Sequence, residues 1–159
     1  MEDEDFNLTI AYDKLKQKYK LPKFDKLLED FDIEKTIEKE PTFLVREIRR
    51  TINEKLSAYT HLFETLINST TTPMFIFSAL RKIDEDTKEK IKDVYKRLSK
   101  LQIKSIKLDT IYSEKSEAEF INIAFDEWQN LKEIINGIIE KLEENIREDN
   151  SSRERGYFG

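Results

Sequence analysis

The chain has 159 residues, 38% charged and 38% hydrophobic, and its formal net charge is −5. It contains no cysteine and a single histidine, and the first of its three glycines is Gly137. This composition excludes disulfides, thiol catalysis, zinc sites of the usual Cys/His kind, glycine-rich phosphate loops and a nucleophile elbow. A chain of this length suits one domain, and we expect no metal and no cofactor.

The apolar runs and the acidic start of the chain bear on its compartment. No apolar run approaches the roughly 20 residues that a membrane-spanning helix needs. The first six residues, MEDEDF, are acidic where a signal peptide would be basic. We therefore expect a cytoplasmic protein without membrane contacts.

Helical periodicity organises the chain from its N-terminal part onward. Two short helices are predicted at about 8–19 and 24–31, and a long one follows over 43–67. In that long helix one apolar face recurs at spacings of three and four: Val45, Ile48, Ile52, Leu56, Tyr59, Phe63 and Leu66. A polar stretch that ends at Pro73 terminates it.

Residues 73–82 are expected to form a short helix, beginning with four consecutive apolar residues after Pro73. A one-sided helix needs fewer, so the segment is either buried on all sides or exposed as an apolar patch for a partner. Of these two alternatives we favour burial in the core.

Two further long helices complete the prediction. One begins at the acidic residues from Asp84 and runs to about Ile111, with core positions Ile91, Val94, Leu98 and Leu101, then Ile106 or Leu108. The other begins at Ser116 with a Ser-x-x-Glu capping box and runs to about Arg147. The fold class is all-α: an antiparallel bundle of three long helices with shorter flanking helices over 1–148, followed by a flexible tail, 149–159.

Charge is unevenly distributed along the chain. Residues 1–42 carry −4, residues 43–112 carry +5 and residues 113–159 carry −6. In the middle segment basic residues form a stripe on one helix, with no acid between Tyr95 and Leu108: Lys96, Arg97, Lys100, Lys104 and Lys107. The stripe is a solvated face, a nucleic-acid surface or a partner of the acidic third helix.

Three arginines, Arg46, Arg49 and Arg50, cluster within about one turn of the first long helix. They either pair with Glu side chains of the same chain or contact a partner, since guanidinium forks suit carboxylates and phosphates. At the C-terminal end, Gly156 and Gly159 flank Tyr157 and Phe158, which either dock onto this domain or a partner or belong to a disordered tail.

Two resemblances rest on these residues. The Leu21-Pro-x-Phe24 motif, the block 43–50 (FLVREIRR) and the Gly-Tyr-Phe-Gly ending resemble a family of small, charged, all-helical archaeal proteins of uncharacterised function. Residues 43–108 are similar to the helical domain of GINS replication-complex subunits, in which such helices pack subunits together. The second resemblance implies a subunit of a larger assembly.

We therefore expect a non-enzymatic adaptor or complex subunit that acts through protein–protein contacts, associated with a replisome or a ribosome, as a homo-oligomer or within a hetero-complex. The alternatives are direct RNA or DNA binding through the Lys/Arg faces, and a structural or ligand-sequestering bundle. An enzyme using His61 as a general base would need a nucleophile, and none can be named.

Overall fold

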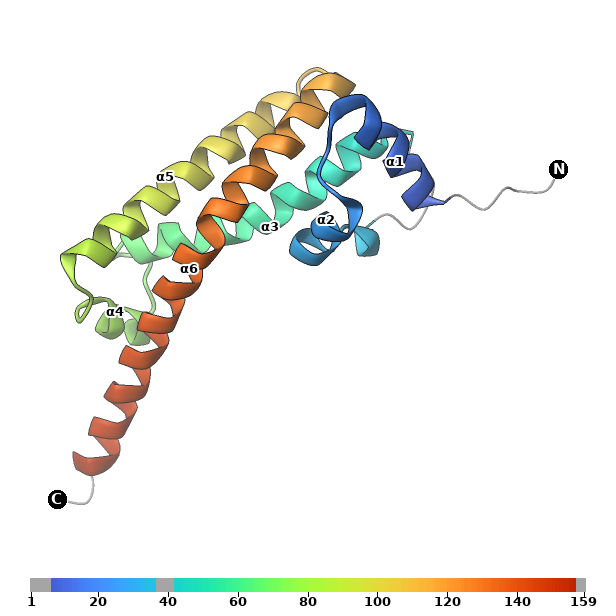
Figure 1. Cartoon of the computed structure of the whole chain (residues 1–159). Helices are drawn as coiled ribbons and strands as arrows, with labels where there is room; N and C mark the ends of the chain where they lie inside the picture. The colour runs from blue at the N-terminus through green and yellow to red at the C-terminus, as the bar shows by residue number, and fades with distance from the viewer. Residues whose placement is uncertain (1–6, 37–41, 157–159) are drawn as a thin grey trace. The chain divides into compact units, whose positions relative to one another are not determined.

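A computed structural model describes residues 7–36 and 42–156, and within these ranges the regular elements are all helices, without strands (Figure 1). The elements are α1 (Leu8–Tyr19), α2 (Phe24–Phe31), the 3-10 helix η1 (Ile33–Thr36), α3 (Leu44–Ile67), α4 (Met74–Leu80), α5 (Glu85–Leu108) and α6 (Glu114–Gly156). The predicted all-α class, with three long helices and shorter flanking ones, is confirmed.

The chain divides into two compact units that each take a part of every long helix. Unit 1 comprises residues 1–57 and 100–128, and unit 2 comprises residues 58–99 and 129–159. Unit 1 thus holds α1, α2, the start of α3, the end of α5 and the start of α6. Unit 2 holds α4 and the remaining parts of the three long helices.

Local signals start and stop the shorter elements. The Asn7 side chain caps α1 by accepting a hydrogen bond of 3.2 Å from the amide of Ile10. The helices α1 and α2 end at Lys20 and Asp32, whose φ angles of 54° and 53° place both in the left-handed region. Asp84 caps α5 through a 2.7 Å hydrogen bond from the Thr87 amide.

Hydrophobic periodicity identified most of the buried residues. Six of the seven positions predicted on α3 are buried, and Tyr59 is half-buried. On α5 the first four predicted core positions are buried. Of the two candidates for the fifth, Ile106 is 59% exposed, so that prediction was wrong, and Leu108 is half-buried. The next position in that series is Ser105, which is fully buried and continues the inward face as a polar residue.

Within unit 1, α3 and α5 run antiparallel. Arg46 donates a hydrogen bond to the Leu108 carbonyl at 3.0 Å. One turn later along α3, Arg49 donates to the Ser105 hydroxyl at 3.0 Å. Position numbers rise along α3 while they fall along α5, as in the predicted antiparallel arrangement.

The boundaries predicted for the third long helix were wrong at both ends. Its N-cap is Ser113, whose hydroxyl accepts a 3.3 Å hydrogen bond from the Ser116 amide, so Ser116 lies inside the helix. The helix then continues through Gly156, over 43 residues or about 65 Å. Residues 149–156 of the expected tail are therefore helical, because polar residues with ordinary helix propensity continue a helix once it has formed.

Exposure along α4 overturns the preference for burial of its first turns. Met74 is 77% exposed, Phe75 62% and Phe77 37%, whereas Ala79 is fully buried. A seven-residue helix can direct only part of its surface inward, and here the small Ala79 takes that place. Met74, Phe75 and Phe77 thus form the exposed apolar patch that was the second alternative, while Ile76 is half-buried.

Gly137 lies within α6, and a side-chain carbon added there would meet no atom within 4 Å. Gly137 is therefore not required by a close approach of another helix. None of the described helices is long and apolar enough to cross a membrane.

Candidate partner-binding surface

The arginines of α3 enter a buried ionic cluster in unit 1. Arg49 is 1% exposed and its Nε donates to Glu117 Oε2 of α6 at 2.7 Å. The other Glu117 oxygen accepts from Arg46 Nε at 2.9 Å, and Glu117 itself is completely buried. Arg49 also pairs with Asp109, in the loop after α5, at 2.6 Å. We call Arg46, Arg49, Ser105, Asp109 and Glu117 the ionic cluster.

The surroundings of Arg49 and Asp109 in the ionic cluster favour the charged form of each side chain. Burial opposes the charge of Arg49, but hydrogen bonds to Glu117 and Asp109 outweigh that cost and raise the pKa of the guanidinium. The hydrogen bond from Arg49, joined by its charge and those of Arg50 and Arg46, lowers the pKa of Asp109. Both partners are therefore charged throughout the neutral range.

The ionic cluster holds the corner where α5 ends and α6 begins. Arg46 donates to the carbonyl of Leu108, the last residue of α5, which has no acceptor role inside the helix. The guanidinium of Arg46 also lies 4.8 Å from the centre of the Tyr112 ring, and Phe43 packs against the same ring at 4.4 Å. The start of α3 is thereby joined to the corner between α5 and α6, 62 residues further along the chain for the Arg46–Leu108 pair.

The three arginines of the sequence prediction therefore differ in their surroundings. Arg49 is enclosed by its carboxylates and Arg46 is 16% exposed, so intramolecular pairing, which the sequence left open, accounts for both. The side chain of Arg50 is 49% exposed and pairs with Glu47 at 3.1 Å. Of the three, Arg50 alone lies largely in solvent.

The lysines of α5 contrast with the arginines. Lys100, Lys104 and Lys107, all in unit 1, are exposed, and their ammonium groups make no hydrogen bond or ion pair with any residue that the structure describes. In unit 2, Lys96 is exposed, while Arg97 is 28% exposed and lies 3.5 Å from Asp93. The basic stripe is therefore presented to solvent most fully by the last turns of α5.

Two exposed isoleucines lie among these lysines: Ile103, which the sequence prediction did not single out, and Ile106, which it gave as an alternative core position. Ile103 is 69% exposed and Ile106 is 59% exposed. Both fall outside the series of buried positions that runs through Leu98, Leu101 and Ser105. That offset from the core series was the available sequence signal. We call Lys100, Ile103, Lys104, Ile106 and Lys107 the α5 surface.

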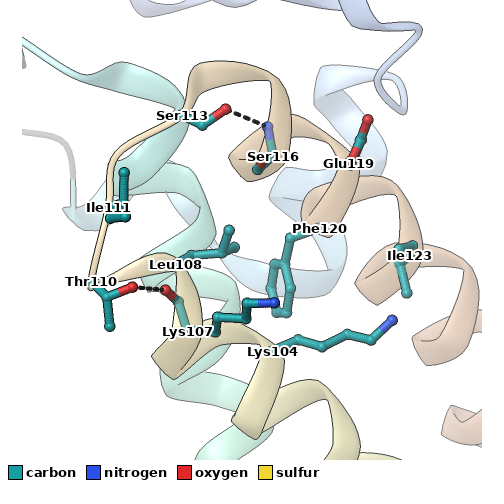
Figure 2. Close-up of a pocket in the computed structure, with 10 residues that line it drawn as sticks. All are labelled: Lys104, Lys107, Leu108, Thr110, Ile111, Ser113, Ser116, Glu119, Phe120 and Ile123. Carbon is teal, nitrogen blue, oxygen red and sulfur yellow. Dashed lines mark hydrogen bonds between the residues drawn. The ribbon is translucent and has the colours of Figure 1, made fainter.

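A pocket of about 400 Å³ adjoins the α5 surface, between the end of α5 and the first turns of α6 (Figure 2). The side chains of Lys104 and Lys107 extend from α5 toward Phe120 and Ile123 of α6. Phe120 is 3% exposed and forms an apolar wall, whereas Ile111 and Ile123 are 79% and 44% exposed. No periodicity in the sequence could locate this pocket, because it forms where two helices meet at a loop.

The remaining candidates from the sequence do not join this surface. The His61 side chain is 83% exposed, with Nδ1 3.9 Å from Glu64 Oε2. Tyr157 and Phe158 lie outside the described residues. Over residues 7–36 and 42–156, no group of three His, Cys, Asp or Glu side chains is arranged to hold a metal ion.

Comparison with known proteins adds no assignment. No family model matches the chain. The searches of curated proteins and of solved structures likewise found no match.

Proposed function

We propose that this chain is a non-enzymatic adaptor or complex subunit that holds an acidic protein partner against the α5 surface. The observation that carries the proposal is the alternation of unpaired lysines with exposed isoleucines on the last turns of α5. Ammonium groups attract carboxylates, and exposed Ile103 and Ile106 offer apolar area that a partner can cover. Ile103 and Ile106 are three residues apart, so they are neighbours on the helix surface and present one continuous apolar area.

Direct nucleic-acid binding is the second candidate. It is favoured by Lys100, Lys104 and Lys107, which follow one another along α5 at spacings of four and three residues. Phosphate contacts supply most of the affinity of such binding and make it steeply dependent on salt. They gain little from Ile103 and Ile106. Acidic residues in the rest of the chain, which bring the net charge to −5, also oppose it.

The two candidates separate in a binding experiment with two labelled probes. One probe is a short peptide in which Asp and Glu flank a single Phe, and the other is a single-stranded RNA oligonucleotide. We expect the peptide to bind and the variant Lys100→Glu/Lys104→Glu to lose that binding. The variant Ile103→Ser/Ile106→Ser should bind the peptide more weakly, and its affinity for the RNA should be unchanged. Binding of RNA alone, with a steep salt dependence, would replace the adaptor proposal by the second candidate.

A matched control is available on the same helix. Lys90 and Lys92 are 52% and 62% exposed, and within the described part of the chain their ion pairs are with Asp86 and Glu89, neighbours along α5. Lys90→Glu/Lys92→Glu makes the same change in net charge as the test variant. If this control loses peptide binding equally, the interaction is a general charge effect and not a property of the α5 surface.

Assembly into an oligomer or a hetero-complex is supported by the exposed apolar residues of α4 in unit 2. Met74 and Phe75 are the most exposed of them, and single large exposed side chains gathered on one short helix are typical of contact surfaces. Light scattering after size exclusion tests the homo-oligomer. We expect a dimer or larger species, and a monomer at high concentration would contradict it.

A further inference from the structure

The pocket beside the α5 surface has an apolar interior and a basic edge. Leu108 of α5 and Phe120 of α6 supply its apolar walls, with Ile111 and Ile123 at the solvent side. Its volume of about 400 Å³ falls in the range of pockets that hold small ligands or single large side chains. Lys104 and Lys107 lie on the α5 side (Figure 2).

The only carboxylate lining the pocket does not neutralise these lysines. Glu119 lies in ion-pair range of Lys115, at 3.8 Å, on its own helix. Figure 2 shows its carboxylate directed away from Lys104 and Lys107. The other polar lining side chains besides the lysines are hydroxyls. Thr110 donates to the Lys107 carbonyl at 2.7 Å, the Ser113 oxygen accepts from the Ser116 amide, and the third hydroxyl is that of Ser116. The pocket is therefore complementary to a group that is apolar at its tip and anionic beside it.

An extended chain fits this arrangement better than a small free acid. The lysines continue from the pocket along α5 to Lys100, and exposed Ile103 lies next to Lys107 and Lys100 on the helix surface. A small carboxylate would engage one end of this surface, whereas an acidic polypeptide would engage its whole length.

Resting on the proposed function, we propose that the pocket receives one aromatic side chain of an acidic segment of the partner protein. Carboxylates on either side of that aromatic residue pair with Lys104 and Lys107. The aromatic ring packs against Phe120 and Leu108, where edge or offset contacts with another ring are favourable. The pocket thus makes binding specific for acidic segments that contain an aromatic residue, whereas the lysines by themselves would bind any acidic segment.

Two probe peptides of the same charge test the pocket. In the first, Asp and Glu flank a Phe, and in the second the Phe is replaced by Ala. We expect the full-length chain to bind the Phe peptide at least about tenfold more tightly, because one large apolar side chain is removed from water only in that complex. This comparison needs no change in the protein, so it is independent of folding defects.

A pocket-filling variant then locates the effect. Ser116→Trp places a bulky ring where the peptide side chain would lie, and Gln17→Trp, on the exposed side of α1, is the matched control. We expect Ser116→Trp to reduce the affinity for the Phe peptide to that for the Ala peptide. It should leave the affinity for the Ala peptide unchanged. Circular dichroism and urea unfolding establish that each variant is folded.

The outcomes separate this inference from the proposed function. If the two peptides bind with equal affinity and Lys100→Glu/Lys104→Glu loses both, the pocket does not bind an aromatic side chain, and the adaptor proposal is retained. Absence of binding by either peptide would overturn both. Residues 2–6 of this chain, Glu-Asp-Glu-Asp-Phe, have the same chemistry as the probe. If the Phe peptide binds only a chain lacking residues 1–6, the chain's own segment is the occupant and the partner proposal is overturned.

Discussion

Two basic clusters that look alike in sequence have opposite environments in the structure. Two of the three arginines of α3, Arg46 and Arg49, point into unit 1, where Arg49 is 1% exposed and shares Glu117 with Arg46. The lysines of α5 point to solvent, and those at 100, 104 and 107 have no ionic partner among the described residues. Each chemistry matches its place. A guanidinium fork can pair with two carboxylates at once, here buried Glu117 and half-exposed Asp109, and a hydrated ammonium is suited to the surface.

The difference teaches that charge alone does not identify a binding surface. The arginines stabilise the corner that supports α5, and the lysines on that helix remain available to a partner. A buried ion pair is weak evidence of net stability compared with an apolar replacement, but breaking one side of it is strongly destabilising. The comparison therefore predicts large effects on unfolding for one cluster and large effects on binding for the other.

The largest effect is expected from Glu117→Gln. It removes the buried negative charge that Arg46 and Arg49 share, and leaves the Arg49 guanidinium with only the half-exposed Asp109 as a counter-charge. We expect the free energy of unfolding to fall by about 3–5 kcal/mol, measured by urea denaturation at neutral pH. Arg50→Ala is the control, because Arg50 is half-exposed, and it should give no resolvable change. Equal effects of both variants would contradict the comparison.

A smaller loss is expected from Ser105→Ala. The Ser105 hydroxyl accepts a 3.0 Å hydrogen bond from Arg49 Nη1 and is fully buried. Removing the acceptor leaves a charged donor less satisfied, which costs about 1–3 kcal/mol. Urea denaturation measures the loss, and in the double variant with Glu117→Gln the two costs should not add, since both act on the same guanidinium. If the two losses of unfolding free energy add strictly in the double variant, the contribution of the Ser105 hydroxyl is independent of the Arg49–Glu117 pair.

A pH-dependent effect of under about 1 kcal/mol is expected from Asp109, because its side chain is 50% exposed. Its pKa is lowered in the folded state, chiefly by the hydrogen bond from Arg49. Its contribution to stability is therefore complete above the unfolded pKa, near about 4, and is lost as pH falls through the lower folded value. The unfolding free energies of wild type and Asp109→Asn should converge as pH falls from about 5 to about 2. If the two unfolding free energies differ by a constant amount over that pH range, the charge of Asp109 does not stabilise the ionic cluster.

The smallest effect on stability is expected from Lys104→Ala. Lys104 is exposed and makes no ion pair with the described residues, so the urea midpoint should not change resolvably. Binding of the acidic Phe peptide should nonetheless weaken. Lys104→Ala would break the comparison if it destabilised the protein as Ser105→Ala does, because the lysine would then have a structural partner.

Much of the fold was predictable because apolar spacing along a helix identifies its buried face. That signal located α3, α5 and α6, and most of the core residues predicted on α3 and α5. It placed the end of α6 too early, since a polar extension such as 149–156 has no apolar periodicity to mark it. It also preferred burial for residues 74–77, because local hydrophobicity does not reveal how little of a short helix can face inward.

The sequence by itself determined that this is a helical protein without cysteine chemistry, with a basic middle segment between two acidic ones. Tertiary structure alone decided which cations of that segment are neutralised, because Glu117 lies 68 residues from Arg49 along the chain. It also created the pocket beside Lys104 and Lys107, by bringing the end of α5 against the start of α6. Periodicity describes one helix at a time, whereas an ion pair or a pocket requires two.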